Sequence, residues 1–211
     1  MYPTEIDMAP AMHKPVRTER ARKTAGIVGK ASGDNAPIAE SGDVLATTYK
    51  NADKTIALIA YEPQKGVDAY VQEVSAATPM EIVEIERHGV QGIFLKDLSK
   101  RMSLPTTRIF AILGVPKATA EKKAASGEFV TGAGGQAAIG MIKLLGIARD
   151  IVDNSTAEGA RNFDSAKWLG EWIERPQPAL GGRKPSDLID TPTGVEVVAR
   201  LLGSIESGAY Q

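Results

Sequence analysis

One short loop near the end of the chain constrains the fold more than any other stretch. Residues 176–182 read Pro-Gln-Pro-Ala-Leu-Gly-Gly. Because proline fixes φ and glycine permits conformations closed to other residues, we expect this loop to be stiff and then sharply bent. It lies between a predicted helix that carries both tryptophans of the chain, Trp168 and Trp172, and a final apolar helix over residues 195–205. The pattern predicts a small helical domain over residues 161–211.

Further residues at fixed spacing surround this loop. They are Trp168-Leu169, Pro185, Leu188-Ile189, Thr191-x-x-Gly194, Leu201-Leu202 and the ending Ile205-Glu206-x-Gly208-x-Tyr210. Together with the loop they resemble the toxin-binding domain of the Xre/MbcA/ParS antitoxins, and a weaker resemblance extends back to about residue 78. The resemblance implies an antitoxin of a type II toxin–antitoxin system. Its partner would be a RES-domain toxin that consumes NAD or transfers ADP-ribose from it.

The resemblance also implies which residues bind the toxin. Aromatic and aliphatic positions would supply affinity through buried apolar area. The last residues would block the toxin's NAD site, into which family members are thought to insert this end. The implied toxin-binding residues are Trp168, Trp172, Pro178, Ala179, Leu180, Gly181, Leu201, Leu202, Ile205, Glu206, Gly208 and Tyr210. From the residues alone two other interpretations stay open, because tryptophans are more often core than interface and a terminal tyrosine often packs on its own domain.

Composition excludes several other functions. The 25 Lys and Arg residues balance 26 Asp and Glu, so the formal charge of −1 gives no bulk attraction to nucleic acid or membrane. Basic residues nevertheless gather at residues 13–30 and 96–123, where local patches could meet phosphates. The sequence has no cysteine, which excludes disulfides, thiol nucleophiles and thiolate metal sites. It also lacks an apolar signal core and any run long enough to span a bilayer, so a cytoplasmic location is expected.

The first part of the chain carries weaker structural signals. Residues 1–42 are rich in Pro, Ala, Gly, Ser and charge, which is typical of a mobile arm. Residues 44–49 and 55–61 favour β-strand, and residues 50–54 can turn between them, so a short β-hairpin is expected. Short apolar runs also fit a helix, and that alternative stays open. Residues 1–75 together form an expected N-terminal extension that is partly disordered.

Helical signals begin at residue 78. Thr78-Pro79-Met80-Glu81 is a capping box with proline at the first helical position. Further helices are expected over residues 94–102, 109–113 and 117–125. The tight Leu113-Gly114-Val115-Pro116 turn between the last two favours a helix-turn-helix, and this region also resembles the Xre-like helix-turn-helix of the same family. We therefore expect a helix-turn-helix domain with its central helix over residues 76–153.

The second helix of this pair would face DNA with short polar or basic side chains. The implied contacts are Lys117, Thr119, Lys122 and Lys123, with help from Arg108 and the basic arm over residues 14–30. Glu121 departs from the family pattern, in which an apolar residue and arginine are usual here, and it would repel phosphate. A solvated lysine face is the alternative interpretation. Since a single helix-turn-helix reads few base pairs, operator binding is expected from a homodimer or a higher assembly.

The longest predicted helix runs from about residue 133 to residue 152. Its broad apolar stripe predicts a central helix buried on two sides, which leaves room for a subunit contact. The stripe consists of Ala138, Met141, Ile142, Leu145, Ala148, Ile151 and Val152. The glycine-rich residues 128–140 resemble the opening of a dinucleotide-binding site. Gln136 stands where a third glycine would help, however, and no second strand follows, so nucleotide binding is not expected.

The remaining helices complete a mainly α fold. The tryptophan helix can be capped by Asn162 or Asp164. The final helix has two competing N-caps, Thr191 and Thr193. Gly203 inside that helix predicts a close approach of another backbone, since glycine otherwise costs a helix roughly 1 kcal/mol against alanine.

The residues that could support catalysis are scattered. His13 and His88 lie in the arm and at a helix end, and the carboxylates form no cluster, so no catalytic residue, metal ligand or cofactor is expected. The favoured function is an antitoxin that binds its toxin and represses its own operon. The alternative is a DNA-binding transcriptional regulator without a toxin partner, whose C-terminal domain serves self-association. An enzyme ranks third.

Overall fold

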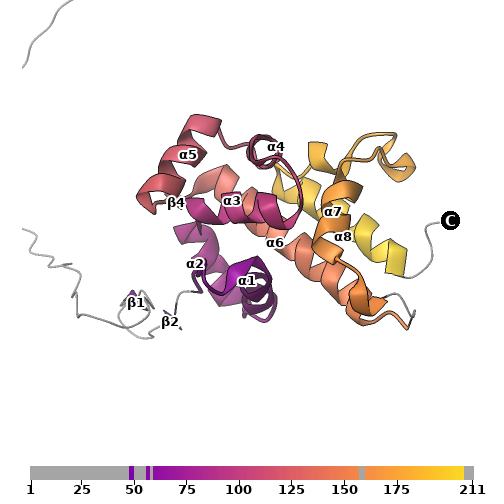
Figure 1. Cartoon of the computed structure of the whole chain (residues 1–211), viewed down its shortest axis with the longest axis horizontal. Coiled ribbons are helices and arrows are strands. Elements are labelled where there is room, and N and C mark those ends of the chain that lie inside the picture. Colours follow the sequence, from indigo (N-terminus) through magenta and orange to yellow (C-terminus); the bar gives the residue numbers. More distant parts are fainter. Residues whose placement is uncertain (1–47, 50–55, 58, 157–159, 207–211) are drawn as a thin grey trace, which may run out of the picture. The chain divides into compact units, whose positions relative to one another are not determined.

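The computed structural model describes residues 48–49, 56–57, 59–156 and 160–206, and these are mainly α-helical, as the sequence predicts (Figure 1). All of them belong to one unit of the chain, residues 44–211. The α-helices are α1 (Gly66–Ser75), α2 (Pro79–His88), α3 (Gly92–Arg101), α4 (Thr106–Ile112), α5 (Lys117–Ser126), α6 (Gly132–Asp153), α7 (Ser165–Ile173) and α8 (Pro192–Glu206). Short 3-10 turns are η1 (Ala160–Asn162), η2 (Pro178–Leu180) and η3 (Pro185–Asp187).

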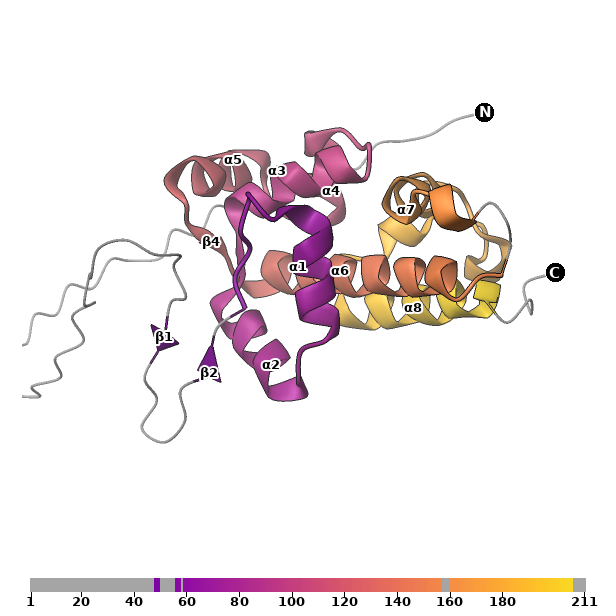
Figure 2. The same cartoon turned by 60° about the horizontal axis from the view of Figure 1, so that its bottom comes forward.

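Helix α6 lies at the centre of the described unit. It packs against α1, α2, α7 and α8, and Figure 2 shows α8 running alongside its second half. Its buried residues come from every side of the helix, as expected of an apolar helix with neighbours all round. They include Ala137, Ala138, Ile139, Met141, Ile142, Leu144, Leu145 and Ala148. The prediction of a central helix buried on more than one side is confirmed.

Local signals place the helices between residues 78 and 127 as expected. The capping box of α2 is formed, with the Oγ1 of Thr78 accepting from the backbone N–H of Glu81 and the Glu81 carboxylate accepting from the N–H of Thr78. Helix α5 begins after Pro116 and ends at Gly127, whose φ of 70° is left-handed. A Cβ at Gly92 on α3 would overlap the backbone of α5, so this glycine lets the two helices pack closely.

Helix α1 was not predicted, and the start of helical structure at residue 78 is wrong. Its apolar residues Val67, Tyr70, Val71 and Val74 have helical spacing and are buried. The N-cap, Lys65, makes no side-chain cap hydrogen bond within the described chain, so the usual start signal is missing. The helix forms because tertiary packing covers its apolar face: the ring of Tyr70 lies 5.3 Å from that of Phe94 on α3.

The predicted hairpin is confirmed where it can be described. β1 (Thr48–Tyr49) pairs antiparallel with β2 (Ile56–Ala57), with Thr48 opposite Ala57. The expected turn over residues 50–54 and the arm over residues 1–42 lie outside the described residues.

The glycine-rich segment before α6 serves packing and not a dinucleotide fold. β4 (Phe129–Val130) pairs antiparallel with β3 (Val90–Gln91), and the chain then enters α6 directly. A Cβ at Gly135 would press on the carbonyl oxygen of Val130, and a Cβ at Gly134 on the side chain of Val115. The glycines therefore bring the start of α6 against β4 and the α4–α5 turn. In the described ranges no parallel sheet accompanies them.

Two helical glycines differ in what surrounds them. Gly170 on α7 faces the carbonyl oxygen of Met102, so the backbones of α7 and the end of α3 nearly touch. A Cβ added at Gly203 on α8 would meet no atom of the described part of the chain within 4 Å. The predicted close approach at Gly203 is therefore wrong for the described chain, and Gly170 is where it occurs. At the start of α8, Thr191 acts as the cap, since its Oγ1 accepts from the N–H of Gly194 at 3.1 Å.

We expect Gly170→Ala to destabilise the fold by about 1–3 kcal/mol, because the added methyl group must push α7 away from α3. Gly203→Ala is the matched control. It should be neutral or gain up to about 1 kcal/mol from higher helix propensity. Urea denaturation followed by circular dichroism measures both. Equal stability of the two variants would contradict the close packing at Gly170.

Candidate functional site

Helix α7 carries a row of aromatic rings that runs from the core to the surface. Asp164 caps the helix by accepting from the N–H of Lys167 at 3.0 Å, which settles the two predicted caps in its favour. The rings of Trp168 and Trp172 stack with centroids 6.0 Å apart, and Phe163 lies 6.1 Å from Trp168. Trp172 is buried, Trp168 is half-buried and Phe163 is 46% exposed. The outer part of this row can therefore meet a partner.

A pocket of about 620 Å³ opens beside these rings. Its walls come from the end of α6, the turn before α7, Trp168 and the end of α8. The lining residues are Ala148, Ile151, Val152, Asn154, Ser155, Thr156, Ala160, Phe163, Trp168 and Ile205. Aliphatic and aromatic groups dominate its floor, and three short polar side chains stand at one side. Such a pocket suits an apolar or aromatic side chain of a binding partner.

The loop that follows α7 is closed at its base by Gln177. The backbone N–H of Gln177 donates to the carbonyl of Arg183 at 2.9 Å, and its own carbonyl accepts from Gly182 at 3.0 Å. Its buried side-chain amide donates to the carbonyl of Arg175 at 3.1 Å. Gly181 and Gly182 have φ values of 65° and 82°, which other residues rarely adopt. The sharp bend expected from the sequence is confirmed.

Because its base is held, the loop presents its tip outward. Pro178, Ala179 and Gly181 are exposed, and Leu180 is half-buried. A rigid exposed segment loses little entropy when a partner binds it, and this favours affinity. The loop tip follows α7 in the chain, and most of the pocket-lining residues precede α7.

The other predicted toxin-binding residues divide between core and surface. Trp172 and Leu202 lie in the core of this structure, and their contact with the toxin stays a prediction. Leu201 is 9% exposed, and Ile205 is half-buried in the pocket wall. The core position of the first two follows from their spacing, since the apolar stripe of a helix faces α6 before it faces a partner. The Glu206 side chain, Gly208 and Tyr210 lie outside the described residues.

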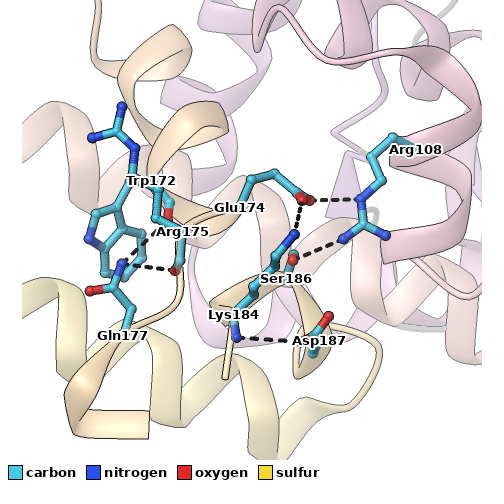
Figure 3. Close-up of polar contacts among 8 residues, drawn as sticks. All are labelled: Arg108, Trp172, Glu174, Arg175, Gln177, Lys184, Ser186 and Asp187. Carbon is cyan, nitrogen blue, oxygen red and sulfur yellow. Dashed lines mark hydrogen bonds and ion pairs between the residues drawn. The ribbon is translucent and has the colours of Figure 1, made fainter. Parts of the chain in front are cut away.

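An ion-pair network ties the loop to α4 (Figure 3). The carboxylate of Glu174, which follows α7, accepts from Nε of Arg108 at 2.7 Å and from Nζ of Lys184 at 3.3 Å. Nη2 of Arg108 also donates to the buried Oγ of Ser186 at 3.1 Å. Burial alone would raise the pKa of Glu174, but the hydrogen bonds from Arg108 and Lys184 outweigh it and hold that pKa below its ordinary 4.5.

The predicted DNA-binding residues do not share one environment. Lys117, Thr119 and Lys122 are exposed on α5. Lys117 lies 3.8 Å from Glu121, a weak surface pair. Lys123 donates to the carbonyl of Phe129 at 2.6 Å and so secures the end of α5 to β4. Arg108, on α4, is held by Glu174 and Ser186, as described above. Of the predicted DNA contacts, Lys117, Thr119 and Lys122 are thus the ones exposed on α5.

Sequence reasoning missed three residues of the site. Gln177 is a polar residue between two prolines, a position where its amide has to find backbone partners. Glu174 and Phe163 flank the tryptophan helix, and their partners come from other parts of the fold, so local patterns carry no signal for them. Within the described ranges, no group of three His, Cys, Asp or Glu side chains could hold a metal ion. None of the described helices is long and apolar enough to cross a membrane.

We expect Glu174→Gln to lower stability by about 1 kcal/mol at pH 7, since it removes the charge that Arg108 and Lys184 bind. The pKa of Glu174 is lower in the folded state than its ordinary 4.5. The stabilisation by its charge is therefore fully present above pH 4.5 and is lost as pH falls through the pKa of the folded state. The difference between the wild type and the variant should therefore vanish on acidification. Urea denaturation over a pH series measures it.

Glu171→Gln is the control for this prediction. Glu171 pairs with Arg175 at 3.1 Å, and both side chains are at least half exposed, so stability should change little at any pH. The difference in unfolding free energy between the wild type and Glu174→Gln could also persist at the lowest pH where both fold. That result would show that the charge of Glu174 is not its cause.

Comparisons with known proteins agree with this geometry. Residues 159–208, which hold α7, the loop and α8, match the antitoxin Xre/MbcA/ParS C-terminal toxin-binding domain. The chain is also 34% identical over 134 residues to a Prs ADP-ribosylating antitoxin of Sphingobium sp. (strain YBL2), an alignment that spans 64% of this chain and 83% of that protein. The aromatic row and the clamped loop therefore lie within a toxin-binding domain, and the chain belongs to the Xre/MbcA/ParS-type antitoxins.

Proposed function

We propose that this antitoxin binds and neutralises a RES-domain toxin that consumes NAD or uses it for ADP-ribosylation. The observation that carries the proposal is the exposed loop tip, Pro178 to Gly181, held rigid by Gln177 within a toxin-binding domain. A preorganised apolar tip after α7 and an aromatic pocket at the start of α7 supply the buried area that a stable complex needs. The chain acts by binding and carries out no catalysis of its own.

Affinity and inhibition reside in different parts of the domain. The loop tip and Trp168 hold the toxin, while the last residues of the chain enter its NAD site. Residues 207–211 follow Glu206, the last residue of α8, in the sequence, and Ile205 near the end of that helix lines the pocket. Glycine at position 208 allows the chain to leave the helix, and Tyr210 offers an aromatic ring for a narrow cleft.

The first test of this proposal is co-purification of the full chain with the RES-domain protein encoded beside it. Deletion of residues 207–211 should leave that complex intact but restore most of the toxin's NAD turnover, because the block is removed while the holding surface stays. Binding is measured by calorimetry and turnover by NAD consumption. If the truncated chain still inhibits fully, the body of the domain covers the active site instead. Failure of the full chain to bind the RES-domain protein supports the regulator without a toxin partner.

The antitoxin also represses its own operon through α4 and α5, as a homodimer or within a larger toxin–antitoxin complex. In α5 the buried residue is Ala120, and most of the other side chains face outward. A helix that exposes most of its side chains and follows a tight turn can enter a DNA groove. The proposed limits remain 76–153 for the helix-turn-helix domain and 161–211 for the toxin-binding domain, after an extension over residues 1–75.

Replacement of both Lys117 and Lys122 by alanine should weaken operator binding and flatten its salt dependence, since each lysine that meets a phosphate releases about one counterion. Gel-shift titrations at several salt concentrations measure both effects. The control is Lys143→Ala, because Lys143 lies on α6 and pairs with Glu86 at 3.6 Å. Operator affinity and salt slope equal to those of the wild type in the double variant would remove α5 from the DNA interface.

A further inference from the structure

Arg108 has a role that its place in the predicted helix-turn-helix conceals. We infer that Arg108 and Glu174 position the toxin-binding loop, so that toxin affinity depends on a pair that need not touch the toxin. The inference rests on the proposed binding of a RES-domain toxin. It assigns Arg108 to the toxin-binding side of the molecule, although Arg108 itself belongs to α4.

The first step of the argument is the position of Glu174 at the base of the loop. Glu174 directly follows α7, and Lys184 lies on the other side of the loop, yet the two side chains meet at 3.3 Å. This ion pair joins the two sides of the loop base, next to the backbone hydrogen bond that Gln177 donates to Arg183. An ion pair and a backbone hydrogen bond therefore both close the base of the loop, and together they set the direction in which the tip points.

The second step is the link from this base to the rest of the molecule. Arg108 places Nε on Glu174, before the loop, and Nη2 on Ser186, after the loop (Figure 3). One guanidinium group thus fastens both sides of the loop base to α4. Arginine suits this task because its planar fork offers several donors at fixed angles. Ser186 is 4% exposed, which shields this end of the network from solvent.

The third step concerns the opposite end of α7. There Arg101, at the end of α3, pairs with Asp164 at 2.6 Å and with Asp68 of α1 at 2.8 Å. Between the two arginines, Gly170 contacts the carbonyl of Met102. Helix α7 is thus held at its start, its middle and its end by the α3–α4 segment. Loss of the contacts that Arg108 makes frees the loop, while the contacts at Asp164 and Gly170 keep α7 in place.

This geometry also bears on the alternative role of Arg108 as a phosphate contact. Two of its three guanidinium nitrogens already donate inside the protein, one to a carboxylate whose pKa its charge keeps low. A phosphate would have to compete with Glu174 for the same charge and would leave that carboxylate with Lys184 alone. The loop role keeps Glu174 paired with both Arg108 and Lys184, and Ser186 paired with Arg108.

The test is a set of four variants of the full chain titrated with the RES-domain toxin. Arg108→Gln and Glu174→Gln should each weaken toxin binding about tenfold, mainly through faster dissociation or slower productive docking of a loosened loop. The double variant should bind the toxin no more weakly than the single variant with the lower affinity, because both changes remove the same Arg108–Glu174 pair. Arg108→Lys, which keeps the charge but loses the fork, should fall between the wild type and Arg108→Gln.

Two further measurements separate positioning from general damage. All titrations are done at a temperature where circular dichroism shows each variant to be folded, and Lys143→Gln, which breaks a remote ion pair with Glu86, should bind toxin like the wild type. Operator affinity of Arg108→Gln should equal that of the wild type in the same gel-shift assay that detects the α5 lysines.

Several results would overturn the inference. They are toxin affinity unchanged in both single variants, additive losses in the double variant, or weaker operator binding by Arg108→Gln. These outcomes are distinct from failure of the proposed function, in which the wild-type chain itself does not bind the RES-domain toxin. Wild-type binding with loss in the two single variants and partial recovery by Arg108→Lys supports the positioning role.

Discussion

Burial of α6 is the constraint on which the described structure depends most. A helix that is apolar on nearly all sides has to be covered by several neighbours, and here α1, α2, α7 and α8 cover it. These helices come from regions that are far apart in the sequence. The predicted helix-turn-helix region and the toxin-binding domain consequently share one core. A change in the packing of either region therefore affects the other through α6.

The shared core decides which toxin-binding candidates reach the surface. Trp172 and Leu202 lie in the shared core, whereas Phe163 and Trp168 extend the aromatic row outward to the pocket. The loop tip reaches the surface for another reason, since hydrogen bonds at Gln177 close its base and leave Pro178 and Ala179 without a place in the core. Residues predicted to contact the toxin and residues that stabilise the core thus alternate along a short stretch of chain.

Charge is divided in the same way. The basic excess over residues 96–123 looks uniform in the sequence, but its members have different tasks. Arg101 and Arg108 hold the two ends of α7, and Lys123 secures the end of α5. Lys117 and Lys122 face solvent on α5. A basic patch inferred from sequence therefore overstates the number of charges that are free to meet a ligand.

The sequence by itself determined the helices with local start and stop signals, such as α2 with its capping box and α5 between Pro116 and Gly127, because those signals act within a few residues. It also determined the stiff loop, because proline and glycine restrict or permit φ wherever they stand. Tertiary structure alone decided the formation of α1, the burial of Trp172 and the pairing of Arg108 with Glu174. Each of these depends on residues from other elements of the fold, and the free energy of such contacts arises only when packing around α6 brings the segments together.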